Sequence, residues 1–369
     1  MVNILITGAK GFVGKNLCVA LRQQAQVVLY EVDLDNSPEE LQQALRVADV
    51  VFHLAGVNRP KEEKEYQTGN AGFTSKICST LQTLARAPKI VFSSSIQAEL
   101  ENPYGASKLT AEEILRDFAA GFGSECVVYR LNNLFGKWCR PNYNAVTATF
   151  CYNVAHDLPL SISDPSREME LTYIDDVVEA FLGEITGGLP GFRYAEPLVS
   201  YRATLGELAE TIQSFRQMRS SLQMPEFSQP FVRALYASYV SYLDQADFVY
   251  PLTIKTDERG SLAEFIKAPG MGQVFVSRTR PGITRGNHYH HTKVEKFLVL
   301  EGEAVIRFRH ILGTEEIEYR VRGDEYRVVD IPPGYTHAIQ NVGAGDLVTL
   351  FWSDEIFDPE KPDTTFEEV

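Results

Sequence analysis

The start of this chain joins a short apolar run to three closely spaced glycines, and few folds accommodate that combination. Residues 2–7 (Val-Asn-Ile-Leu-Ile-Thr) predict a buried β-strand, and Gly8, Gly11 and Gly14 follow at once. An apolar segment of helical periodicity comes next. A strand, a glycine turn and a helix in this order predict a dinucleotide-binding unit, because spaced glycines let the backbone approach a pyrophosphate at the helix N-terminus.

The alternation of strands and helices continues after the turn. Apolar runs predict three further strands, at residues 27–30, 50–54 and 90–92. The helical segments between them imply right-handed crossovers and a parallel sheet, at whose carboxyl edge ligands bind. Leu54 and Ala55 lie at the end of the third strand, and a run of three serines (93–95) follows the fourth. Both segments are therefore expected at the binding edge.

The residues around the turn give conflicting indications of which dinucleotide binds. The second strand runs into Glu31 and Asp33, and a carboxylate there would accept the ribose 2′-hydroxyl of NAD. Lys10, inside the turn, could instead meet the 2′-phosphate of NADP. From these residues alone, the choice between NAD and NADP stays open.

Tyr104 and Lys108 form a second motif with chemical meaning. They stand four residues apart on a predicted helix and therefore project from the same face. A phenol has a reference pKa of ~10, and a neighbouring ammonium group favours its ionised form. The pair suits the reversible reduction of a carbonyl, whose oxygen needs a proton as hydride reaches its carbon.

Length and charge restrict the class of protein further. A chain of 369 residues exceeds one typical core, so two domains are expected. A net charge of −14 argues against a nucleic-acid partner and against an anionic membrane. No apolar run is long enough to span a bilayer, and no cleavable signal is expected before the first strand. Five cysteines without paired metal spacing favour reduced thiols in a cytoplasmic protein.

The pattern of the sequence changes towards the C-terminus. Residues 224–250 are rich in aromatics and prolines and lack a clear rhythm of helices and strands, so we place a boundary near residue 245. Residues 1–245 are expected to form the α/β domain. Residues 246–369 contain short β runs separated by glycines, which predict an all-β barrel or jelly roll.

Histidines in this second part have the spacing of a metal site. His288 and His290 are expected to point to one face of a predicted strand. Glu295 lies in the segment that follows, and His337 comes shortly after Pro332-Pro-Gly. Three imidazoles and one carboxylate suit a first-row transition metal with room for a water or a substrate. His291, beside these ligands, is our candidate for a base.

The first part of the chain resembles the extended short-chain dehydrogenase/reductases that modify nucleotide sugars. Thr7-Gly8-x-x-Gly11-x-x-Gly14, the serine run and Tyr104-x-x-x-Lys108 carry this resemblance over roughly the first 240 residues. It implies that Tyr104 is the acid/base, that Lys108 lowers its pKa and holds the ribose, and that Ser95 hydrogen-bonds the substrate carbonyl. Ser94 is the alternative to Ser95, since the segment from Ser95 to Tyr104 is shorter than in many relatives.

The same resemblance implies further contacts. The cofactor would touch Thr7, Gly8, Lys10, Gly11, Phe12, Gly14, Leu54, Ala55, Tyr104 and Lys108. Asn133, Arg130 and Lys137 would face the nucleotide sugar. The spacings around His288 and His337 are similar to the two cupin motifs, with a longer stretch inside the second, and they imply a zinc-binding cupin.

Over its whole length the chain resembles the CapF-type bifunctional nucleotide-sugar enzymes of capsule and O-antigen synthesis. Asn102-Pro-Tyr-Gly and Gly286-Asn-His-Tyr-His-His-Thr-Lys carry this resemblance. It implies a UDP-linked 2-acetamido-2,6-dideoxy-4-keto-hexose that the zinc-bearing cupin epimerises at C3. Reduction with NADPH then gives UDP-N-acetyl-6-deoxy-L-talosamine, on the route to N-acetyl-L-fucosamine. A homodimer formed largely through the cupin is also implied.

Two other functions fit the same residues. One is a metal-dependent dioxygenase or isomerase cupin carried on a cofactor-binding regulator. The other is a 4-keto nucleotide-sugar reductase whose cupin is only a zinc-stabilised dimerisation module, because a cupin metal need not be catalytic. For an epimerase, a metal or donors such as Lys296 and Tyr335 could stabilise the enolate while a base moves the proton.

Overall fold

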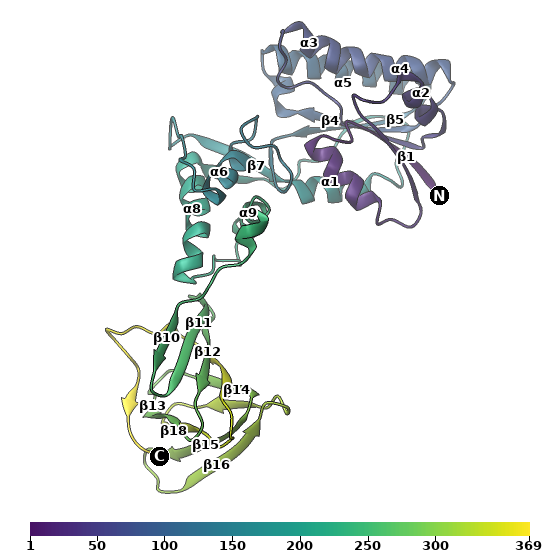
Figure 1. The fold of residues 1–369 in the computed structure, drawn as a ribbon. Coiled ribbons are helices and arrows are strands. Elements are labelled where there is room, and N and C mark those ends of the chain that lie inside the picture. Colours follow the sequence, from purple (N-terminus) through teal and green to yellow (C-terminus); the bar gives the residue numbers. More distant parts are fainter. The chain divides into compact units, whose positions relative to one another are not determined.

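The computed structural model describes residues 1–369 and divides them into two compact units (Figure 1). The first unit comprises Met1–Gln213 and Pro230–Leu243, and the second comprises Ser214–Gln229 and Asp244–Val369. We expected a boundary near residue 245, and in the structure one junction between the units lies between residues 243 and 244. The second unit also includes the earlier segment 214–229. None of the helices combines the length and the apolar character needed to cross a bilayer.

The first unit is built on a six-stranded parallel sheet in the order β2-β1-β3-β4-β5-β8. Its strands are β1 (Val2–Thr7), β2 (Val27–Val32), β3 (Val50–His53), β4 (Lys89–Ser95), β5 (Glu125–Leu131) and β8 (Gly191–Tyr194). The predicted strands at 2–7, 27–30, 50–54 and 90–92 all belong to this sheet. The serine run forms the last three residues of β4, so it stands at the carboxyl edge as expected.

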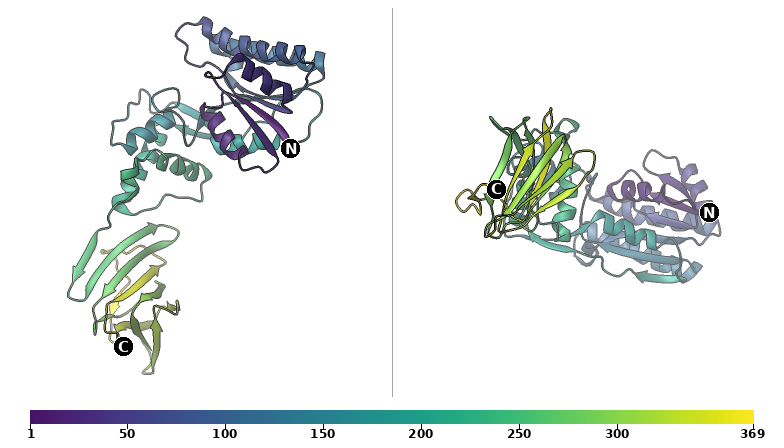
Figure 2. Two further views of the ribbon diagram at one scale, coloured as in Figure 1. Left: turned by 45° about the vertical axis from the view of Figure 1, so that its right-hand side comes forward. Right: turned by 90° about the horizontal axis from the view of Figure 1, so that it is seen from below.

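Helical elements connect these strands. They are α1 (Phe12–Leu21), α2 (Pro38–Val47), α3 (Lys64–Tyr66), the π-helical segment η1 (Gln67–Gly72), α4 (Phe73–Thr83), the 3-10 helix η2 (Ile96–Glu99), α5 (Pro103–Phe122) and α7 (Ile174–Gly183). One apolar core packs α2, α4 and α5 against one face of the sheet through Leu45, Leu81 and Leu115. A second core packs α1 and α7 against the other face through Leu17 and Phe181 (Figure 2). This doubly wound arrangement confirms the predicted Rossmann-like fold.

A smaller lobe completes the first unit. It contains a three-stranded sheet in the order β6-β7-β9, together with further helices. Its elements are β6 (Asn133–Phe135), α6 (Val146–Ala155), β7 (Glu168–Tyr173), β9 (Tyr201–Thr204), α8 (Leu205–Ser221, which continues into the second unit) and α9 (Pro230–Val240). α9 occupies the aromatic stretch in which the sequence showed no helical rhythm.

The second unit consists of two antiparallel sheets. After η3 (Gln245–Phe248), the first sheet has the order β10 (Ile254–Asp257), β11 (Gly260–Ala268), β12 (Gly272–Thr279), β19 (Leu347–Ser353), β14 (Glu295–Glu301) and β17 (Val328–Ile331). The second has the order β16 (Glu316–Arg322), β15 (Glu303–His310), β18 (Tyr335–Asn341), β13 (Thr284–Tyr289) and β20 (Thr365–Phe366). Phe297 and Phe351 of the first sheet join Phe308 and Ile339 of the second in one core. The predicted all-β cupin fold is confirmed.

A buried cluster of charges joins three strands at the amino edge of the parallel sheet. Lys89, the first residue of β4, lies 3.2 Å from Glu125 and 2.6 Å from Glu184 (Nζ to carboxylate oxygen), and its side chain is 9% exposed. Arg193 on β8 contacts Glu184 at 2.7 Å. The Tyr129 hydroxyl also donates to Glu184. This cluster links the edge strand β8 to the rest of the sheet. It lies at the end of the sheet opposite to the carboxyl edge.

Replacing Lys89 with Ala should destabilise the fold, because two buried carboxylates would lose their buried cation and keep only the partly exposed Arg193. We expect a loss of about 3–5 kcal/mol in the free energy of unfolding, measured by urea denaturation of the full-length protein. The matched control is Lys76→Ala on the exposed side of α4, with an expected effect within about 0.5 kcal/mol. Equal losses for the two variants would show that the cluster contributes no more than a surface lysine.

Candidate active site and metal centre

The glycine turn after β1 is shaped by close backbone contacts. A Cβ at Gly14 would lie 2.1 Å from the Gly8 carbonyl oxygen, and one at Gly8 would lie 2.8 Å from the Cα of Ala55. Gly8 also has a positive φ of 73°, which disfavours other residues. Gly11 is the N-cap of α1 and Phe12 is its first residue, with no side chain capping the helix. The uncapped N–H groups at the start of α1 suit a pyrophosphate.

The loop after β3 is held against the same turn. Leu54 donates its N–H to the Thr7 carbonyl at 3.1 Å, and Ala55 donates to the Thr7 hydroxyl at 3.3 Å. His53, which is 1% exposed, lies 2.8 Å from that hydroxyl through Nδ1. Burial, with the charge of Lys108, lowers the pKa of His53 to about 3, so the imidazole is neutral and serves as a hydrogen-bonding spacer. The predicted cofactor residues of β1 and β3 thus lie together.

Ser95, Tyr104 and Lys108 are brought together by the start of α5. Asn102 caps this helix by accepting the N–H of Gly105, and a Cβ at Gly105 would lie 2.0 Å from the Gln97 carbonyl oxygen. The first turn of α5 is therefore pressed against η2, which Ser95 itself caps. This close packing explains how the short segment between Ser95 and Tyr104 still returns the phenol to the carboxyl end of β4.

The two titratable groups of this motif are both affected by burial. Burial raises the pKa of Tyr104, and a hydrogen bond with the Ser95 hydroxyl offsets part of that increase. Burial lowers the pKa of Lys108 to about 8, while the Glu112 carboxylate acts in the opposite direction. The Lys108 ammonium donates to the Ser93 carbonyl at 2.9 Å and lies 5.9 Å from the centre of the Tyr104 ring. The Lys108 ammonium also lies close to the loop after β3: a Cβ added at Gly56 would be 3.2 Å from Lys108 Nζ.

Ser94 and Arg130 have a different environment from the one expected. The Ser94 hydroxyl donates to Glu112, which is fully buried on α5. Arg130 forms two hydrogen bonds with the same carboxylate and an ion pair with Glu99 at 2.6 Å, while the Tyr194 hydroxyl donates to Glu112. Arg130 thus neutralises a buried carboxylate instead of facing a nucleotide sugar. Of the two serines, Ser95 is the one beside Tyr104.

Asn133 lines a cavity of about 280 Å³ in the smaller lobe. Other lining residues include Arg167 and Leu205, and Asn133 donates to the Glu170 carbonyl at 3.1 Å. The start of α6 also lines this cavity, and its N-cap, Ala145, provides no side-chain cap. Lys137, expected to face the nucleotide sugar, is ion-paired with Asp175. Arg167 is the cation that our sequence analysis missed, because it lies 34 residues after Asn133 with no motif around it.

A second cavity, of about 420 Å³, adjoins the same start of α6. Asn144, Ala145 and Val146 line both cavities. Arg59 lies over the Tyr143 ring at 5.4 Å, and Arg140 approaches that ring at 5.1 Å. The start of α6 is therefore surrounded by cations and uncapped N–H groups, a setting that favours an anionic ligand.

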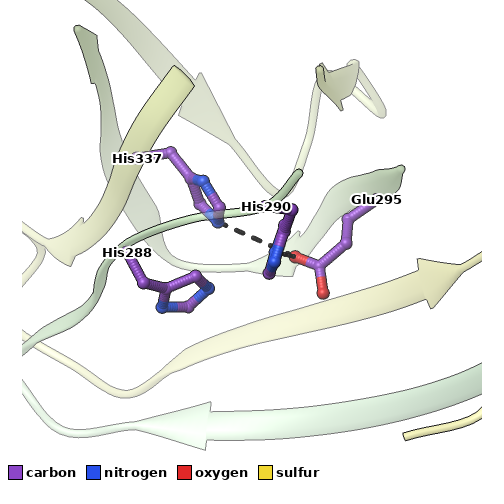
Figure 3. Close-up of side chains that lie close together, drawn as sticks. All are labelled: His288, His290, Glu295 and His337. Carbon is purple, nitrogen blue, oxygen red and sulfur yellow. Dashed lines mark ion pairs between the residues drawn. The ribbon is translucent and has the colours of Figure 1, made fainter. Parts of the chain in front are cut away.

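In the second unit, the four predicted metal ligands converge (Figure 3). His288 ends near His337 because these residues are paired across β13 and β18. All candidate ligand atoms of His288, His290, Glu295 and His337 lie within 4.8 Å of one another. The Glu295 carboxylate is 3.5 Å from His290 Nε2 and 3.7 Å from His337 Nε2.

The charge states of this cluster suit metal binding. Burial lowers the pKa of His337 to about 3, and burial together with His290 lowers the pKa of His288. Burial alone would raise the pKa of Glu295, but its neighbours, His290 first among them, hold it below its ordinary value. Neutral imidazoles and an ionised carboxylate are the forms that bind a metal.

Two buried nitrogen atoms indicate that a ligand belongs here. The Nε2 atoms of His290 and His337 are buried and have no hydrogen-bond partner. An unpaired buried polar atom is costly, and a metal ion would satisfy both at once. Three nitrogen donors and one carboxylate fit Zn²⁺ or a similar first-row ion. The residues present therefore fit the metal that the sequence predicted.

The segment near the C-terminus orients these ligands. His290 Nδ1 lies 2.5 Å from the backbone oxygen of Asp363, which directs Nε2 towards the cluster. The Asp363 carboxylate accepts the N–H groups of His291, Thr292 and Lys293 at 2.8–2.9 Å. β20 then pairs with β13 at His288. Such outer contacts fix the direction of ligand side chains, and Asp363 carried no recognisable signal in the sequence.

His291 does not join the metal cluster. It lies in the bend after β13, its side chain is exposed, and its ring lies 5.2 Å from that of Tyr289. Lys296 is ion-paired with Asp330. The expected base is therefore separated from the four ligands.

Comparison with known proteins gives one match for each part of the chain. Residues 4–186 match the NAD dependent epimerase/dehydratase family, and residues 255–365 match the polysaccharide biosynthesis C-terminal domain. A UDP-glucuronic acid 4-epimerase from Bacillus cereus, solved with NAD, has a TM-score of 0.53 at 20% identity. It covers 58% of this chain and 84% of its own, and at this identity it shows the shared fold of the first part only.

Two relatives match over the full length. UDP-2-acetamido-2,6-beta-L-arabino-hexul-4-ose reductase from Pseudomonas aeruginosa is 41% identical over 363 residues, which are 98% of each chain. The crystal structure of the capsular polysaccharide assembling protein CapF from Staphylococcus aureus has a TM-score of 0.92 and 47% identity, with complete coverage of both chains. The Rossmann unit with its Ser95–Tyr104 edge, the four-ligand cupin and these matches lead to one conclusion: the chain belongs to the CapF family of nucleotide-sugar epimerases/reductases.

Proposed function

We propose that this protein is a bifunctional enzyme acting on a UDP-linked 2-acetamido-2,6-dideoxy-4-keto-hexose. The second unit epimerises C3 and the first reduces the 4-keto group, giving UDP-N-acetyl-6-deoxy-L-talosamine for N-acetyl-L-fucosamine in capsule or O-antigen. The observation that carries this proposal is that one chain holds two separate candidate sites, the Ser95–Tyr104–Lys108 group and the four converging side chains around His337. The name of the Pseudomonas aeruginosa relative, a 4-ketose reductase, supports the substrate class.

Reduction uses the edge formed by β1, β3 and β4. A reduced nicotinamide dinucleotide bound along the glycine turn supplies the hydride; the family resemblance implies NADPH. Ser95 would orient the keto oxygen, and Tyr104 would donate a proton to it as the carbon is reduced. Lys108, nearly fully buried behind the loop at Gly56, would favour proton loss from the phenol.

The nucleotide end of the substrate would occupy the smaller lobe. Its diphosphate needs cations and N–H donors, which Arg167, Arg59 and the uncapped start of α6 provide. Asn133 at the rim of the same cavity can bond a phosphate or a hydroxyl group. This arrangement would direct the sugar towards Tyr104.

Epimerisation would take place in the cupin unit. His288, His290, Glu295 and His337 would hold a Zn²⁺ ion. The ion would supply Lewis acidity that makes the hydrogen beside a ketone easier to remove. The chain's own contribution is to hold three imidazoles and one carboxylate around one site and to fix His290 through Asp363. A homodimer through this unit stays a prediction from the family resemblance.

Tyr104→Phe should separate the two activities. Loss of the proton donor should lower the rate of dinucleotide oxidation by about 10²–10⁴-fold, while deuterium from D₂O should still enter C3 of the keto sugar. NMR of the sugar follows the second reaction. His290→Ala is the reciprocal variant and should abolish the C3 exchange.

Two results would contradict this assignment. Unchanged reduction by Tyr104→Phe would remove the phenol from the mechanism. Unchanged C3 exchange in a His290→Ala protein shown to lack metal would exclude the cupin metal from the epimerisation.

Reduction should decline as the pH rises through about 8, where buried Lys108 loses its proton. The pKa of Lys108 is lowered by burial and raised by Glu112, so Glu112→Gln should shift this decline to lower pH. The measurement is kcat/KM for reduction between pH 6 and 10. Glu113→Gln, on the exposed side of α5, is the matched control and should leave the profile in place. If kcat/KM of the Glu112→Gln variant declined at the same pH as that of the native protein, deprotonation of Lys108 would not be the cause of the decline.

Asp363→Ala should weaken zinc binding by about 10–100-fold, because the loop carrying His290 would lose its anchor. Competition with a chromophoric chelator measures this affinity directly. Asp358→Ala is the control, since this exposed carboxylate bonds only to the N–H of Glu360 within the same segment. Equal zinc affinity in the two variants would show that Asp363 does not organise the ligands.

A further inference from the structure

A carboxylate stands fixed at the mouth of the glycine turn. Asp33 directly follows β2, and its Oδ2 accepts the backbone N–H of Lys10 at 2.7 Å. Its Oδ1 accepts the N–H of Leu34 at 2.8 Å. Both donors belong to the backbone, so the position of the carboxylate does not depend on the side chain at residue 10.

This is the place where a dinucleotide presents its adenosine ribose. In Rossmann folds an acidic residue about 20 positions beyond the glycine turn binds the ribose 2′-hydroxyl, and NADP-binding proteins have a cation there instead. Asp33 lies 19 residues after Gly14. A carboxylate has about four acceptor positions, so Asp33 can still accept a hydroxyl besides its two backbone donors. A 2′-phosphate at the same point would face a like charge.

The cations nearby are already matched by other carboxylates. Lys10, the one cation within the turn, is ion-paired with Asp35. Arg22 is ion-paired with Glu31 at 2.6 Å. Asp33 forms no ion pair of its own, although its charge helps to raise the pKa of Lys10. The end of β2 therefore carries a net negative charge where a 2′-phosphate would need a positive one.

We infer that the reductase unit of this chain selects NADH over NADPH, and that Asp33 is the residue responsible for the selection. This conclusion departs from the NADPH that the family resemblance implies. It rests on the proposed reductase function, because a dinucleotide must bind at the glycine turn for the selection to operate. Asp35 contributes by holding Lys10 away from the ribose.

Dinucleotide binding tests the inference without turnover. NADH and NADPH are titrated separately into the full-length protein without sugar, and binding is followed by the fluorescence of the reduced nicotinamide. We expect the Kd for NADPH to exceed that for NADH by at least tenfold. Added salt should narrow the gap, because it screens the repulsion between the 2′-phosphate and the carboxylate.

Substitution identifies the residue. Asp33→Ser should lower the NADPH-to-NADH ratio of Kd values to about one or below, since the like charge is removed and a hydroxyl remains. Asp117→Ser, an equivalent change on the exposed side of α5, should leave the ratio unchanged. Circular dichroism confirms that both variants are folded.

Three outcomes would overturn the inference. Equal or tighter binding of NADPH by the native protein would exclude NADH selection. An unchanged ratio in Asp33→Ser would exclude Asp33 as its cause. Binding of neither dinucleotide would remove the proposed reductase function, and the selection with it.

Discussion

The parallel pairing of β1, β3 and β4 is the constraint on which the first reaction centre depends. Thr7 pairs with His53, and His53 with Phe92, so β1 and β3 end level while β4 continues past them to Ser95. Buried and neutral, His53 connects Thr7 to Thr74 on α4 at 2.9 Å and prevents slippage between these elements. A shift of one residue would turn each of these side chains to the opposite face. Because the register is fixed, the glycine turn, the loop at Ala55 and Tyr104 meet in one place.

The candidate metal site around His337 depends on the burial of its side chains and not on strand register. Burial lowers the pKa values of His288 and His337, and His290 and His337 keep buried nitrogen atoms without a hydrogen-bond partner. Unpaired buried nitrogen atoms destabilise the fold, and the apolar packing of the two sheets around Phe297 and Phe351 offsets this loss. Asp363 adds the directional control, since a buried ligand without a fixed orientation would bind a metal weakly.

Local sequence patterns predicted the elements that carry the chemistry. The Tyr104–Lys108 spacing placed both residues on one helix face, and α5 does carry them. The alternation at His288 and His290 placed both on one side of a strand, and they do join His337 and Glu295. In contrast, α9 was missed, because its buried residues, such as Tyr239, lie within an aromatic stretch whose helical period is masked by prolines at its borders.

The sequence by itself determined the two folds, the glycine turn and the four metal ligands, because each depends on residues that are close together in the chain or on a simple period. Only the tertiary structure decided the partners of charged side chains. Arg130 bonds to Glu112, and Lys10 is ion-paired with Asp35. The backbone N–H of His291 bonds to Asp363, which lies about 70 residues later in the chain. A charge pairs with whichever opposite charge the packing brings nearest, and no local pattern encodes that distance.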